Sequence, residues 1–103
     1  MINFLPDAIA KLTEKHNVSQ KEVLECFANG EAIYLEDTSE EHRTDPPTWW
    51  FMAPTNRNRM LKVCFIRRDG DVLIKTAFEP SSSKHLELYR QQAKLPSCWP
   101  TEE

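Results

Sequence analysis

Four cationic side chains lie close together in the sequence, and their types suit the binding of phosphate. Arg57, Arg59, Lys62 and Lys75 fall between residues 56 and 75, where six basic residues stand against two acidic ones. Arg59 is the first candidate, because its planar guanidinium donates to two phosphate oxygens at once. The other three are supporting candidates. Trp50 adds an aromatic ring on which a nucleic-acid base would stack if the ring is exposed.

Three further side chains have the chemistry for proton transfer. Acid–base catalysis at a phosphate needs a group that takes a proton, a group that gives one, and cations that stabilise the developing negative charge. His42 stands in a polar loop and has an ordinary pKa near neutrality. Glu79 follows a predicted strand and Tyr89 lies on a predicted helix. Each also has an interpretation without catalysis: His42 would be a loop residue with no catalytic role, Glu79 an anion at the start of a helix, and Tyr89 a core residue.

Metal and disulfide chemistry is not predicted. Residues 31–45 hold six acidic residues against one basic residue, but a strand followed by a loop would scatter their carboxylates. The three cysteines are widely spaced and form no Cys-x-x-Cys motif, which indicates free thiols in a reducing compartment. No apolar run is long enough to span a membrane. We therefore expect a soluble cytoplasmic protein without a cofactor. Its net charge of −3 argues against the binding of nucleic acid, which is also negatively charged.

Two helices are predicted at the N-terminus. Pro6 suits a first helical position, and Leu5, Ile9, Leu12 and His16 form one stripe of a helix over residues 6–16. Ser19 and Glu22 form a capping box for a second helix over 20–29, which would bury Val23, Leu24 and Phe27. Gly30 would end that helix in a left-handed conformation. The two helices together would make a helical hairpin.

The rest of the chain changes to strand patterns. We expect strands at 32–36, 48–53, 59–67 and 72–78, the last two joined by Asp69-Gly70, a strong hairpin signal. A third helix follows Pro80, with Leu86, Tyr89 and Ala93 on its buried stripe. The prediction is a single α+β domain over residues 1–94, with helices at both ends on one face of a roughly four-stranded antiparallel sheet. Residues 95–103 would be an irregular tail.

Several segments resemble the BrnT branch of the RelE-like ribonuclease toxins. Residues 15–23 are similar to the Lys-His-Gly-Val-Ser motif and following Glu that open many BrnT-type chains, and residues 59–65 resemble their Gly-Arg-x-Leu-x-Val strand. Glu87 and Tyr89 resemble the Glu and Tyr of the last helix. Residues 35–51 and 75–80 resemble small BrnT-like proteins sometimes labelled ADP-ribosyl-dinitrogen reductase hydrolases. The chain departs at Asn58 and Phe78, where glycine and arginine are common in BrnT-type chains.

The resemblance implies a RelE-like fold and a toxin-like, metal-independent endoribonuclease that acts on single-stranded or ribosome-presented RNA. Its partner would be a cognate antitoxin that covers the basic hairpin, and the chain would form a homodimer or a hetero-oligomer with that antitoxin. The expected catalytic residues are Arg59, His42, Lys62, Glu79 and Tyr89. The expected RNA-binding residues are Arg57, Arg59, Lys62, Lys75 and Trp50.

Two alternative functions remain open. A catalytically inactive module with the same fold would bind a protein partner, and the negative net charge and the missing arginine favour this alternative. An enzyme that processes a nucleotide or an ADP-ribosyl group is the third hypothesis. It has little support in the sequence, because the chain contains only Gly30 and Gly70 and therefore no glycine-rich phosphate loop.

Overall fold

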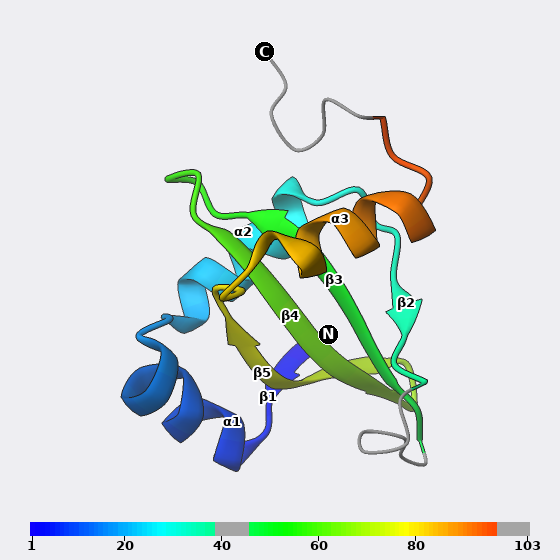
Figure 1. Cartoon of the computed structure of the whole chain (residues 1–103). Coiled ribbons are helices and arrows are strands. Elements are labelled where there is room, and N and C mark those ends of the chain that lie inside the picture. The colour runs from blue at the N-terminus through cyan, green and yellow to red at the C-terminus, as the bar shows by residue number, and fades with distance from the viewer. Residues whose placement is uncertain (39–45, 97–103) are drawn as a thin grey trace.

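The computed structural model describes residues 1–38 and 46–96, which form an α+β fold around a mixed sheet (Figure 1). The strands follow the order β1-β5-β4-β3-β2 across this sheet. In chain order the elements are β1 (Ile2–Phe4), α1 (Pro6–Ala10), the π-helical segment η1 (Lys11–His16), α2 (Gln20–Asn29), β2 (Leu35–Glu36), β3 (Thr48–Pro54), β4 (Met60–Arg68), β5 (Asp71–Phe78) and α3 (Ser83–Gln92).

The sheet confirms the predicted antiparallel strands and adds one that the sequence did not indicate. Strands β2 to β5 pair antiparallel in chain order, and the predicted hairpin turn has positive φ angles at Asp69 (54°) and Gly70 (86°). Strand β1 then pairs in parallel with the first half of β5, so the sheet has five strands and is mixed. The prediction of about four antiparallel strands was therefore incomplete, because a three-residue strand is too short to show an alternating pattern.

The predicted strand over residues 32–36 is shorter than expected, and the conformation of Gly30 differs from the prediction. Ala32 has a φ of 59°, which interrupts an extended chain, and only Leu35–Glu36 pairs with β3. Gly30 is extended, with φ −83° and ψ 178°. A Cβ at Gly30 would lie 3.0 Å from the carbonyl oxygen of Cys26 and 3.2 Å from Cβ of Ala53. Close packing of α2 on β3, rather than a left-handed turn, explains this glycine.

The helices begin where the sequence predicts, but some of them bury different residues. The Ser19 Oγ accepts from the Glu22 backbone N–H at 3.1 Å, and the Glu22 carboxylate accepts from the Ser19 N–H at 3.0 Å, which confirms the capping box. Cys26 is buried in α2, whereas Leu24 is exposed. The predicted stripe of the first helix was also displaced, because Ile9 is exposed. Both helices are rotated relative to the predicted faces.

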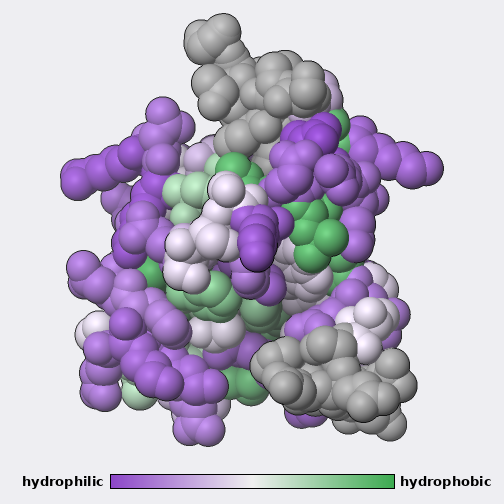
Figure 2. All heavy atoms as spheres, viewed as in Figure 1, coloured by the Kyte–Doolittle hydropathy of each residue, from purple (hydrophilic) through white to green (hydrophobic). Residues whose placement is uncertain are grey.

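Helices cover both faces of the sheet, which corrects the prediction that they share one face. Phe27 of α2 packs on Phe51 of β3, with ring centroids 4.7 Å apart. The adjacent Trp50 points to the opposite face and packs against Tyr89 of α3 at 5.5 Å. Figure 1 shows α3 in front of the sheet and α2 behind it, and Figure 2 shows that hydrophilic residues cover most of the front view.

The segments that correspond to the two predicted N-terminal helices contact different strands, so the expected helical hairpin is not confirmed. Segments α1 and η1 pack on β5, whereas α2 packs on β3 and β4. Strand β1 pairs with Val72, Leu73 and Ile74, and η1 also contacts β5, with the His16 ring 5.4 Å from the ring of Phe78, the last residue of β5. This arrangement brings the side chains of η1 close to the end of β5. Within residues 1–38 and 46–96, no helix has the length and apolar content needed to cross a membrane.

Candidate functional site

The Arg59 side chain contacts three segments: the end of η1, the first turn of α2, and the residue that follows β5. Its Nη1 donates to both carboxylate oxygens of Glu22, at 3.0 and 3.1 Å, and to the carbonyl oxygen of Asn17 at 2.9 Å. Its Nη2 donates to the carbonyl oxygen of His16 at 3.2 Å, and its Nε lies 3.4 Å from a carboxylate oxygen of Glu79. Two carboxylates therefore surround this cation, and it caps the end of η1.

The turn between β3 and β4 fixes the position of Arg59. The Thr55 Oγ1 accepts from the backbone N–H groups of Arg57 and Arg59, both at 3.2 Å. Asn58 has a φ of 64°, a left-handed conformation that asparagine tolerates better than most residues other than glycine. Arg57 is exposed on the turn and lines a polar cleft of about 490 Å³ together with Glu22 and Arg59.

The other two predicted cations lie on the front face of the sheet, in a different cavity. We call it the lysine cavity; it measures about 300 Å³ and is lined by Lys11, Asp37, Thr48, Lys62, Cys64, Lys75, Thr76 and Phe78. Three ammonium groups from η1, β4 and β5 thus stand against one carboxylate among its lining residues. The predicted cationic set therefore divides in two: Arg57 and Arg59 face one cavity, and Lys62 and Lys75 face another.

A β-bulge places Lys75 in this cavity. Cys64 pairs with Thr76 and Phe65 pairs with Ile74, which leaves Lys75 as an extra residue in β5. A bulge re-aims a side chain relative to regular alternation. The Lys75 Nζ consequently reaches across β4 and donates to the Thr48 Oγ1 of β3 at 2.9 Å.

Lys62 contacts two rings on the front face. Its Nζ lies 4.5 Å from the centroid of the Trp50 ring and 3.5 Å from Nδ1 of His85. Because an ammonium group only donates, the close Nδ1 acts as the acceptor. Burial lowers the pKa of His85 below its ordinary value of 6.5, and the charge of Lys62 lowers it further. His85 is therefore neutral at pH 7 and has a lone pair beside a cation.

The remaining predicted residues have structural contacts or lie outside the described segments. Trp50 is 6% exposed, and its ring packs between Tyr89 and Lys62. The Tyr89 hydroxyl donates to the Ile33 carbonyl oxygen at 2.6 Å, and burial raises the pKa of this tyrosine to about 12. His42, along with the acidic residues of the 39–45 segment, lies outside the described residues, as does Trp99 in the tail.

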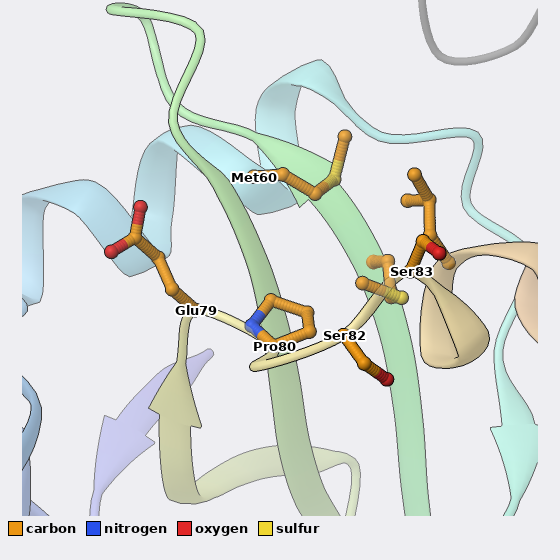
Figure 3. Close-up of a pocket in the computed structure, with 7 residues that line it drawn as sticks. Met60, Glu79, Pro80, Ser82 and Ser83 are labelled. Carbon is orange, nitrogen blue, oxygen red and sulfur yellow. The ribbon is translucent and has the colours of Figure 1, made fainter.

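Glu79 lies at the edge of a third cavity, of about 380 Å³, between the end of β5 and α3. Figure 3 shows its carboxylate extending away from Ser82 and Ser83, and this carboxylate pairs with Arg59. Met52, Met60 and Leu86 give the cavity apolar walls. Its single acidic group is thus already engaged with a cation, and the cavity has fewer charged groups than the lysine cavity.

Sequence reasoning missed four residues around the lysine cavity: Lys11, His16, Phe78 and His85. Lys11 and Phe78 line the cavity, His85 contacts Lys62, and the His16 ring lies 5.4 Å from the Phe78 ring. Alternation along β4 does place Lys62 on the face of Cys64, which was the available signal. Nothing local indicates that η1 and α3 bring their side chains to this face.

The cavity has the chemistry of an anion site. Burial raises the pKa of Cys64 to about 11, so this thiol stays protonated and adds no negative charge. Among residues 1–38 and 46–96, no three His, Cys, Asp or Glu side chains gather closely enough to hold a metal ion.

Comparisons with protein-family models, with curated proteins and with solved structures find no match to this chain.

Proposed function

We propose that this chain is a toxin-like endoribonuclease that binds an RNA phosphate in the lysine cavity. The observation that carries the proposal is the convergence of Lys11, Lys62 and Lys75, from three separate elements, on one cavity of about 300 Å³. Three cations lining one cavity beside a single carboxylate give it an excess of positive charge, which would attract the negative charge of a phosphate. Arg59 does not supply this charge, because Glu22 and Glu79 already neutralise it.

The neutral imidazole of His85 beside Lys62 supports a role in RNA cleavage in addition to RNA binding. We assign it the role of general base: its Nδ1 takes the proton of the 2′-OH, and the 2′-oxygen attacks phosphorus as the bond to the 5′-oxygen breaks. Lys62 and Lys75 stabilise the charge on the phosphorus-bound oxygens, and one of their ammonium groups protonates the leaving 5′-oxygen. The products are a 2′,3′-cyclic phosphate and a 5′-hydroxyl. When Lys62 turns toward the phosphate, it frees the His85 lone pair that it now contacts.

The proposal is tested with a short fluorescent single-stranded RNA. Lys62→Gln and Lys75→Gln should each weaken binding about tenfold, the value of one charge-assisted hydrogen bond. Lys84→Gln is the matched control, because it removes the same charge from an exposed residue that lines none of the three cavities. Equal losses in all three variants would show that the binding is non-specific and would refute the site.

Cleavage is tested separately from binding. His85→Gln should lower the cleavage rate by about 10²- to 10⁴-fold and leave RNA affinity within twofold. The wild-type product should carry a 2′,3′-cyclic phosphate in the presence of a metal chelator. Expression of the wild type alone should arrest growth, and His85→Gln should relieve the arrest. An antitoxin that inhibits this cytoplasmic activity is expected to cover the lysine cavity.

A second candidate is a binding module that keeps the fold without catalysis. The engagement of Arg59 by two carboxylates favours it, because the cation first expected to stabilise the transition state is used in the fold. This candidate predicts that RNA binds in a manner that depends on Lys62 and Lys75, that RNA stays intact, and that expression is harmless. The cleavage assay therefore distinguishes the two candidates.

A further inference from the structure

We infer that Phe78 stacks on the base of the nucleotide whose phosphate lies in the lysine cavity. This inference rests on the proposed function and adds a residue that contacts the RNA base. Phe78 ends β5 and lines the cavity together with Lys11 and Lys62.

Packing in the hydrophobic core does not explain the phenylalanine at position 78. The side chain is half-buried, yet among the described residues it belongs neither to the buried core cluster nor to the hydrophobic side chains packed against that cluster. Each of the other four phenylalanines of the chain belongs to the core cluster or packs against it. Phe78 is therefore an aromatic ring that lines the lysine cavity and lies outside the core.

The neighbours of Phe78 orient it for a nucleotide. The His16 ring lies 5.4 Å from the Phe78 ring at an interplanar angle of 37°, which supports the phenyl ring from the side of η1. Burial lowers the pKa of His16, and the charges of Lys15 and Lys11 lower it further, so this imidazole is neutral at pH 7. The Lys62 Nζ lies 6.0 Å from the Phe78 centroid.

A nucleotide can contact Phe78 and Lys62 at the same time. Its flat base and its phosphate are separated by one sugar, so a base on Phe78 leaves its phosphate close to Lys62. Aromatic side chains stack on unpaired bases of any sequence, because every base has a π-face. Phe78 would therefore add affinity for an unpaired nucleotide without selecting a particular base.

The test compares wild type with Phe78→Leu and Phe78→Trp. Phe78→Leu keeps an apolar side chain but removes the ring, and it should weaken binding of the single-stranded RNA about 5- to 150-fold, the range for one stacked base. Phe78→Trp should bind at least as tightly as wild type. Inorganic tripolyphosphate, which has no base, should bind Phe78→Leu and wild type with equal affinity.

A change in the ligand tests the same contact in the unaltered protein. Removing one base at a time from the RNA should weaken wild-type binding strongly at a single position, and Phe78→Leu should show no such position. If Phe78→Leu binds the RNA as tightly as wild type, or retains the sensitive position, the stacking role is overturned while the lysine site stands. If wild type binds neither RNA nor tripolyphosphate, the proposed function itself fails and this inference fails with it.

Discussion

Replacing Arg59 with methionine is expected to destabilise the fold rather than to remove an RNA contact. Arg59→Met keeps most of the side-chain length but removes four hydrogen bonds: two to Glu22, one to Asn17 and one to His16. A hydrogen bond to a charged group contributes about 1.5 to 3 kcal/mol to stability when it is shielded from solvent. The Arg59 side chain is 22% exposed, and Glu22 keeps its bonds to Ser19, so the four bonds contribute less than their sum.

The expected loss in the free energy of unfolding is about 3 kcal/mol, which for a domain of this size lowers Tm by about 12 to 24 °C. Thermal and urea unfolding, followed by circular dichroism, measure this loss. Arg57→Met is the matched control, because Arg57 is exposed on the same turn, and it should change stability by less than about 0.5 kcal/mol. If Arg59→Met is as stable as Arg57→Met, and its RNA affinity falls instead, the structural role of Arg59 is refuted.

Two other predictions concern stability. Gly30→Ala should lower the free energy of unfolding by about 1 to 3 kcal/mol in urea titrations, because its Cβ would crowd Cys26 and Ala53, whereas Gly70→Asn, at a turn position with open space, should cost less than about 1 kcal/mol. The Ser19 backbone N–H, followed by Arg59, lowers the pKa of Glu22 below 4.5 in the folded state. Its stabilising contribution is therefore complete above pH 4.5 and is lost as the pH falls through the folded-state pKa, so Glu22→Gln should flatten the acid side of the stability profile. An unchanged acid profile would contradict this assignment.

The sequence predicted the elements where short-range signals are strong. The capping box of Ser19 and Glu22 located the start of α2, and Asp69-Gly70 located the β4–β5 turn, because both depend on residues close in sequence. It missed β1, whose stability comes from parallel pairing with a strand about 70 residues away. The rotation of α2 that buries Cys26 in place of Leu24 is likewise set by tertiary packing.

The candidate site was predicted only in part for the same reason. Side-chain alternation along β4 accounts for the face on which Lys62 lies, but a bulge that no local signal indicates turns Lys75 into the same cavity. The pairing of Arg59 with Glu22 joins residues 37 positions apart, and charge counting along the sequence could not reveal it. Lys11 and His85 reach the site from η1 and α3, so their roles appear only when both elements are docked.

The dependence of RNA binding on salt concentration shows whether RNA binds through Lys11, Lys62 and Lys75. Each phosphate neutralised on a single strand contributes about −0.7 to the slope of log Kobs against log salt concentration. A variant with Gln at Lys11, Lys62 and Lys75, shown to be folded by circular dichroism, loses the one phosphate contact of the cavity and should therefore have a slope shallower than that of wild type by about 0.7. Identical slopes and affinities for the two proteins would contradict the account and show that RNA does not bind at the lysine cavity.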